Sequence, residues 1–286
     1  MAQISEATSN RGVVLDIKDG DLNINDHNPT PSFVPKTNED LGPCVTVLLI
    51  QKVLAELAGT FFLIFAGCST KEANLDKENV VTLPGTALAW GLLVMVLVYS
   101  LRHISGSHLN PAVTIAFASC RKFSWKMVPA YISAQVIGST LASGALRLLF
   151  NGKHDHFLGT APGGSDVQSL VMEFMITLFL LFVVSSVVTD NRAVKKLAPL
   201  VIGATISVNV LVAGTISGAS MNPARSLGPA IVWHHYKGLW IYIVGPISGA
   251  IGGAWLYNIF RPTEKSLHDI TKSWPLHRGS GRVCSA

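Results

Sequence analysis

Charge is scarce in this chain of 286 residues: 14% of them are charged, whereas a soluble domain carries about 25%. The chain therefore has too few ionic side chains to cover a surface that faces water. Apolar residues make up 49% of the sequence, and the mean hydropathy is +0.42. These residues come in long uninterrupted runs and not in the short alternating strands of an outer-membrane barrel. The sequence predicts an all-α membrane protein.

Motifs for metal binding and catalysis are also lacking. The four cysteines, Cys44, Cys68, Cys120 and Cys284, lie far apart and form no C-x-x-C pair, so we expect neither a disulfide framework nor a zinc site. We find no His-x-x-x-His pair, no Ser/His/Asp grouping and no glycine-rich phosphate loop. We expect no catalytic residue, no metal and no cofactor. The net charge of +5 lies in short clusters between apolar runs, which does not indicate a nucleic-acid partner.

Six apolar runs are long enough to cross about 30 Å of hydrocarbon, which takes about 20 residues of helix. They cover residues 50–68, 82–102, 127–149, 168–188, 197–216 and 238–260. The connections 103–126 and 217–237 each contain a shorter apolar stretch of about ten residues. Such a stretch is too short to cross, so each connection is expected to be a re-entrant segment.

The polar ends of the chain set its expected organisation. Seven of the 17 acidic residues lie in residues 1–45, and we expect residues 1–48 to be a disordered cytoplasmic tail. Residues 49–261 form the membrane domain, with halves at about 49–150 and 167–261, and residues 262–286 form a C-terminal tail. Basic clusters recur in the second and fourth connections and in the C-terminal tail. The positive-inside rule then places both termini in the cytoplasm.

An internal repeat relates the two halves. Residues 104–112 and 216–224 match at six of nine positions, including Asn-Pro-Ala in both copies. A nearby offset aligns Glu56 with Glu173, so each half has one glutamate in its first span. Each half contains three spans, and because three is odd the second half must cross the membrane in the opposite direction. The two Asn-Pro-Ala segments therefore enter from opposite faces.

The Asn-Pro-Ala segments, Asn110-Pro111-Ala112 and Asn222-Pro223-Ala224, read as helix starts. Asparagine is a good N-cap and proline suits the first helical position. The positive ends of two half-helix dipoles would then meet near the midplane, beside backbone carbonyls and the two asparagine amides. A neutral hydrogen-bonding solute could pass there, whereas a cation would meet two positive ends. An alternating-access transporter could use the same repeat, but we see no intramembrane acids for ion coupling besides the two glutamates.

This pattern closely resembles the major intrinsic proteins, the aquaporin and aquaglyceroporin family, over residues 50–260. Ala-Trp-Gly-Leu at 89–92, the sequence at 218–226 and the turn beginning at Asp190 resemble the plant nodulin-26-like subfamily. The resemblance implies an aquaporin-like fold of six spans and two half-helices. It also implies a passive channel in the lipid bilayer for water and small uncharged solutes, closed to ions and protons. A homotetramer in the plasma membrane or another plant endomembrane is expected on the same ground.

By resemblance, the family's narrowest constriction falls on Trp90, Val210, Ala219 and Arg225. Water-selective members have histidine where this chain has Val210. The resemblance therefore implies a wider slot with an apolar side and a fixed donor, Arg225, on the other, which suits glycerol. Ammonia, metalloid acids and small organic acids remain alternative solutes, because the sequence does not rank them.

Charged and titratable residues elsewhere in the membrane domain have their own expected roles. Glu56 and Glu173 are expected to accept hydrogen bonds from the re-entrant backbone behind the pore, in preference to transferring protons. His108 is expected to line the cytoplasmic vestibule. Arg102 stands where nodulin-26-like members usually have glycine. It either reaches the cytoplasmic headgroups, which we favour, or leans into the pore mouth and hinders it.

Overall fold

The computed structural model describes residues 42–76, 80–150 and 156–261, and every structural statement below concerns these residues. They form helices and connecting loops without a strand in the described ranges. The α-helices are α1 (Gly42–Asp76), α2 (Thr82–Ser105), α3 (Pro111–Ser119), α4 (Val128–Leu149), α5 (Asp166–Thr189), α6 (Ala198–Ala213), α7 (Pro223–Trp233) and α8 (Ile241–Phe260). Short 3-10 helices, η1 (Trp125–Met127) and η2 (Lys195–Leu197), precede α4 and α6.

Six of these helical segments are long and apolar enough to cross a bilayer, as the sequence predicts. Helix α1 begins at Gly42, seven residues before the expected start of the membrane domain, and the first candidate span covers Val47–Asn74. Residues 43–49 are mostly apolar and continue the first run, and a proline is tolerated in the first turn of a helix. The fifth span is also shorter than expected and ends at Ala213 in place of residue 216. Most of the two expected tails, residues 1–41 and 262–286, lies outside the described residues.

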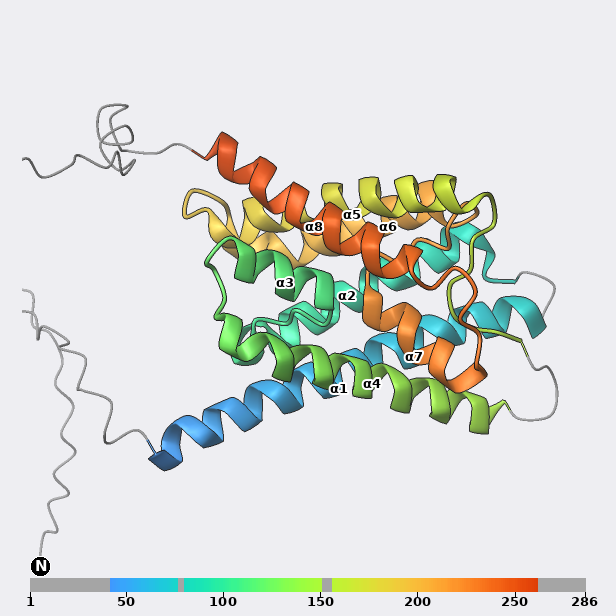
Figure 1. Cartoon of the computed structure of the whole chain (residues 1–286), viewed down its shortest axis with the longest axis horizontal. Coiled ribbons are helices and arrows are strands. Elements are labelled where there is room, and N and C mark those ends of the chain that lie inside the picture. Colours follow the sequence, from blue (N-terminus) through green and yellow to red (C-terminus); the bar gives the residue numbers. More distant parts are fainter. Residues whose placement is uncertain (1–41, 77–79, 151–155, 262–286) are drawn as a thin grey trace, which may run out of the picture. The chain divides into compact units, whose positions relative to one another are not determined.

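The two expected re-entrant segments each contain a short helix, α3 and α7, and Figure 1 shows both among the longer helices. At 1.5 Å per residue, the nine residues of α3 reach about 14 Å, roughly half the hydrocarbon thickness. Helix α3 packs on α4 and α8, and α7 packs on α4. Each half-helix is therefore held inside the bundle by long helices that belong to the membrane spans.

Small residues let the long helices approach closely, as their four-residue spacing in the third and sixth spans predicts. A Cβ atom added at Gly138 of α4 would lie 2.3 Å from the Leu57 carbonyl oxygen of α1. In the second half, a Cβ atom at Gly249 of α8 would lie 2.3 Å from the Phe174 carbonyl oxygen of α5. The same close contact between a glycine and a backbone carbonyl thus occurs in both halves, which supports the internal repeat.

Large apolar side chains remain exposed along the long helices, for example Leu54, Phe62, Val96, Phe179 and Val244. A soluble monomer rarely exposes so much contiguous apolar surface. The buried interior, in contrast, contains many polar side chains. This reversal of the usual distribution fits a bundle with lipid outside and a polar path inside.

Candidate functional site

The two Asn-Pro-Ala segments cap their helices as the sequence predicts. The Asn110 side chain accepts a hydrogen bond from the Ala112 backbone N–H at 2.8 Å, and Asn222 accepts one from Ala224 at 3.0 Å. Each amide also donates across to the opposite loop. Asn110 Nδ2 bonds the Met221 carbonyl at 2.7 Å, and Asn222 Nδ2 bonds the Leu109 carbonyl at 2.8 Å.

These reciprocal bonds join the two loops. The carbonyls of Leu109 and Met221 each accept one hydrogen bond from the amide of the opposite half. A buried amide without a partner is costly, and the crossed bonds give each amide nitrogen one acceptor. They also fix the N-termini of α3 and α7 against each other, so the two positive dipole ends meet at one place.

Left-handed backbone recurs in the two loops with one pattern. Gly106, Ser107 and Leu109 have φ values of 92°, 51° and 50°. Their counterparts Gly218, Ala219 and Met221 have φ values of 79°, 46° and 54°. Side-chain-bearing residues rarely adopt this region, so the surrounding contacts must hold the loops in shape.

The two buried glutamates supply those contacts. Glu56 accepts hydrogen bonds from the Ser105 hydroxyl at 2.6 Å and from the backbone N–H groups of His108 and Leu109 at 2.9 and 2.7 Å. Glu173 occupies the equivalent place at the second loop. The expected hydrogen bonds from the glutamates to the re-entrant backbone are therefore present in the first half.

In the second half, Glu173 accepts from the Ser217 hydroxyl at 2.7 Å and from the N–H groups of Ser220 and Met221, both at 2.8 Å. Both glutamates have no exposed surface. The left-handed turns aim consecutive backbone N–H groups at one carboxyl group in each half. Each glutamate is thus the acceptor around which its loop is built.

Several supporting residues were missed by the sequence analysis. Tyr131 and Tyr242 donate from their hydroxyls to the carbonyls of Ser105 and Ser217 at 2.8 and 2.7 Å. Gln135 donates to both Glu56, at 2.8 Å, and Thr114, at 3.1 Å. The two tyrosines occupy equivalent places in the repeat, so the repeat could have indicated them. Gln135 could have been found because a polar amide is unusual in an apolar span.

Two cavities meet inside the bundle. We call the cavity between the loops and α2, α5 and α6 the pore cavity; it measures about 100 Å³ and is lined by Asn110, Asn222, His108 and Ala219, among others. We call the second cavity, of about 510 Å³, the vestibule. Trp90, Val210 and Arg225 line both cavities. Three of the four residues expected at the constriction therefore form the boundary between the two spaces, and the fourth, Ala219, lines the pore cavity.

Arg225 is fixed at this boundary by neighbours on two sides. Its guanidinium lies over the Trp90 ring, 4.2 Å from the ring centroid, and Nη1 donates to the Ala219 carbonyl. The following residue, Ser226, is bonded to the Thr160 hydroxyl at 2.6 Å, which ties this part of α7 to the loop before α5. The boundary thus combines one oriented cation with the apolar side chains of Trp90 and Val210.

Other charged and titratable groups border the path. His108 lines the pore cavity and not the larger space that we call the vestibule, and its Nδ1 lies 3.1 Å from the Thr114 hydroxyl. Lys71 lines the vestibule and donates to the carbonyls of Phe157 and Gly159 at 3.0 and 2.7 Å, a role the sequence analysis missed. Arg102 lines the pore cavity, which supports the alternative position at the pore mouth.

Comparisons with known proteins agree with this geometry. Residues 44–257 match the family described as Major intrinsic protein. The chain belongs to this family. It is 58% identical over 245 residues to Aquaporin NIP1-1 of Oryza sativa subsp. japonica, covering 86% of each chain. It is 55% identical over 235 residues to Nodulin-26 of Glycine max, covering 82% of this chain and 87% of the relative.

The solved structures give the same result for the fold. The aquaglyceroporin from Plasmodium falciparum matches with a TM-score of 0.63 and 25% identity, over 74% of this chain and 95% of that chain. Together with the relatives, these matches establish a member of the nodulin-26-like subfamily with the aquaporin fold. The protein is an integral multi-pass membrane protein and a passive channel for water and small solutes.

Proposed function

We propose that this major intrinsic protein conducts glycerol and similar small uncharged polyols as well as water, and excludes ions and protons. The observation that carries the proposal is the composition of the boundary between the two cavities. Val210 and Trp90 present carbon there, and Arg225 presents N–H donors beside the Ala219 carbonyl. Apolar side chains together with a fixed donor match the two faces of a polyol, which carries its hydroxyls on a carbon chain.

Exclusion of cations follows from the charges along the path. The N-termini of α3 and α7 place two positive dipole ends beside Asn110 and Asn222. Arg225 adds a full positive charge at the boundary, and the described lining residues of both cavities include no aspartate or glutamate. A cation that leaves its water shell here finds repulsion and no compensating carboxylate.

Vesicles that contain the purified protein test the solute directly. We expect faster glycerol uptake than in protein-free vesicles, a low activation energy and no saturation at ordinary concentrations. The same vesicles are then exposed to water, urea, ammonia, metalloid acids and lactic acid, which ranks the alternative solutes in one experiment. Saturable uptake that follows an ion gradient would overturn the channel proposal and favour an alternating-access transporter.

Replacement of Val210 by His tests the geometry of the boundary. The imidazole adds volume and a polar group beside Arg225, so Val210→His is expected to lower glycerol permeability more than water permeability. Val210→Ala is the matched control: it removes volume without adding a polar group and is expected to leave glycerol permeability at or above the wild-type value. Equal losses of water and glycerol permeability in Val210→His would show that Val210 does not select between them.

We propose three further properties, the first from the positive-inside rule and the other two from family membership. Both termini lie in the cytoplasm, the channel forms a homotetramer with one pore in each subunit, and it resides in the plasma membrane or another plant endomembrane. Exposed apolar side chains on the long helices provide surface for contacts with lipid and neighbouring subunits. Accessibility of tags at each terminus in intact cells, and the mass of the purified protein in detergent, test the first two.

A further inference from the structure

Arg102 lies far along the pore cavity from the Trp90, Val210 and Arg225 boundary. Trp90 and Arg102 both belong to α2 and line the same cavity, and twelve residues of helix place them about 18 Å apart along the helix axis. Val98 of the preceding turn and Val188 of α5 also line the cavity. At this end, a half-buried arginine thus stands beside mostly aliphatic side chains.

The guanidinium of Arg102 is tethered to a neighbouring loop. Its Nη1 donates to the Lys195 carbonyl of η2 at 2.9 Å, and the Tyr99 hydroxyl, one turn earlier on α2, donates to the Lys196 carbonyl at 3.0 Å. Both acceptors are backbone atoms of the segment between α5 and α6. The position of Arg102 therefore depends on where this segment lies.

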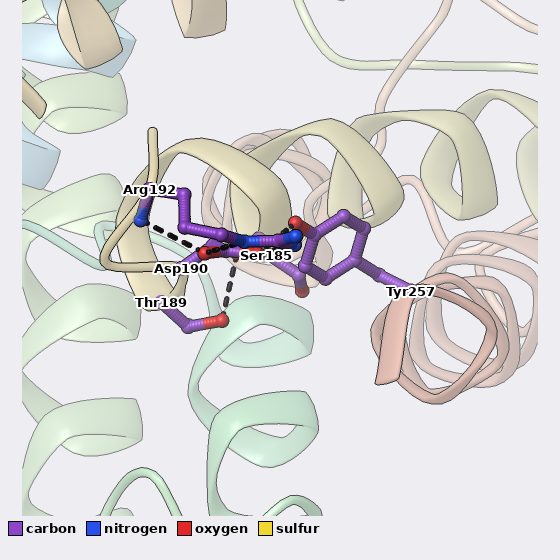
Figure 2. Close-up of polar contacts among 5 residues, drawn as sticks. All are labelled: Ser185, Thr189, Asp190, Arg192 and Tyr257. Carbon is purple, nitrogen blue, oxygen red and sulfur yellow. Dashed lines mark hydrogen bonds and ion pairs between the residues drawn. The ribbon is translucent and has the colours of Figure 1, made fainter. Parts of the chain in front are cut away.

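The other end of the segment is clamped to α8 (Figure 2). The Asp190 carboxylate accepts hydrogen bonds from the Arg192 backbone N–H at 2.9 Å, from Arg192 Nε and Nη2 at 3.0 and 2.7 Å, and from the Tyr257 hydroxyl at 2.7 Å. These donors, Arg192 first, hold the pKa of the Asp190 carboxyl well below its usual range. Asp190 is only 4% exposed, although the Arg192 side chain that covers it faces solvent.

We call the hydrogen bonds of Asp190 with Arg192 and Tyr257 the clamp, and the hydrogen bond from Arg102 to the Lys195 carbonyl the tether. Both involve the same short stretch of backbone. Asp190 ends α5, and the Lys195 carbonyl that holds Arg102 follows after only five residues. The Lys195 ammonium also bonds the Asn191 side chain at 2.8 Å within this stretch. A short segment fixed on α8 at one end and on α2 at the other has little freedom to move.

We propose that Arg102 is a second specificity-determining residue of the channel, which narrows the far end of the pore cavity, and that Asp190 is the positioning residue that holds it there. The inference rests on the proposed passage of polyols. The tethered guanidinium occupies space at the mouth and hinders a polyol more than it hinders water. Release of the tether lets the side chain move out toward solvent, and the mouth widens.

The experiment compares water and glycerol permeability of full-length variants in vesicles of one lipid composition. Arg102→Gly is expected to raise glycerol permeability at least about twofold, equivalent to about 0.4 kcal/mol in the barrier. Water permeability rises less, so the glycerol-to-water ratio increases. Arg102→Lys keeps the charge and one donor and is expected to stay close to wild type. An unchanged or lower ratio in Arg102→Gly would overturn the role of Arg102.

Asp190 is tested by coupling to Arg102. Asp190→Asn is expected to raise the glycerol-to-water ratio in the wild-type background and to have no effect in the Arg102→Gly background, because both changes remove one constriction. Additive effects would overturn the positioning role. Tyr257→Phe, which removes a single hydroxyl from the clamp, gives the same comparison if Asp190→Asn yields too little folded protein.

Failure of this inference is distinguishable from failure of the proposed solute. Wild-type vesicles that take up glycerol no faster than protein-free vesicles would contradict the proposed passage of polyols. If wild-type vesicles do not take up glycerol, the water permeability of Arg102→Gly still tests the role of Arg102, because this variant must conduct water faster than the wild type. Wild-type uptake of glycerol together with an unchanged ratio in Arg102→Gly would contradict this inference alone.

Discussion

Glu173→Leu is expected to abolish most of the correctly folded channel. The leucine fills a similar volume but leaves the Ser217 hydroxyl and the N–H groups of Ser220 and Met221 without their acceptor, and all of these residues are buried. An unsatisfied buried donor costs about 1–3 kcal/mol, so three of them remove at least about 3 kcal/mol from a total stability of about 5–15 kcal/mol. The measurements are the yield of monodisperse protein in mild detergent and its thermal midpoint.

Two control variants separate the lost acceptor from a general effect of mutating α5. Glu173→Gln keeps one acceptor oxygen at nearly the same size, so its midpoint should fall between those of Glu173→Leu and the wild type. Met175→Leu changes a side chain on the same helix that is 52% exposed, and it should behave as wild type. A Glu173→Leu protein with wild-type yield and midpoint would show that the second re-entrant loop does not need this carboxyl group.

Most of the architecture could be predicted from the sequence, because it depends on patterns that are local in the chain. The six spans follow from the lengths of the apolar runs, and the starts of α3 and α7 follow from Asn-Pro. The inverted repeat also gave the pairing of Glu56 with Glu173, and the structure shows both bonded to the equivalent loops. Periodicity and capping act over a few residues, so a sequence reports them well.

The contacts that could not be predicted are those between segments far apart in the chain. In the sequence, Lys71 is only a basic residue near the first connection. In the structure, its ammonium donates to the carbonyls of Phe157 and Gly159, which are 86 and 88 residues away in the chain. Arg102 was expected at the headgroups because an arginine near the end of a span commonly reaches them. Its tether depends on the path of the α5–α6 segment, and no local pattern encodes that path.

The crossed bonds of the two amides show the same limit at the centre of the site. Asn110 and Asn222 were correctly assigned as caps, because capping involves the next few residues. Their bonds to Met221 and Leu109 join residues 111 and 113 positions apart. Those bonds require both loops to be in place, so they appear only once the halves are packed together.

Gly253→Ala is expected to force α8 away from α5. A Cβ atom at this position would lie 2.1 Å from the Leu178 carbonyl oxygen and 2.9 Å from the Phe182 backbone nitrogen. Both are backbone atoms, so no side-chain rotation relieves the clash. Overpacking of this kind costs about 1–3 kcal/mol, which for a chain of this size lowers the thermal midpoint by about 2–12 °C.

Gly252→Ala is the matched control, one residue away on the same helix. A Cβ atom there would lie 3.6 Å from Leu178 Cδ1 and 3.9 Å from Phe174 Cζ, which is ordinary van der Waals contact. Alanine also favours helix over glycine by about 1 kcal/mol, so this variant should match or exceed the wild-type midpoint. Because α5 carries Glu173, displacement of α8 in Gly253→Ala should also lower water permeability per folded molecule. Equal midpoints for the two variants would mean that α5 and α8 tolerate a wider spacing than their shared contact implies.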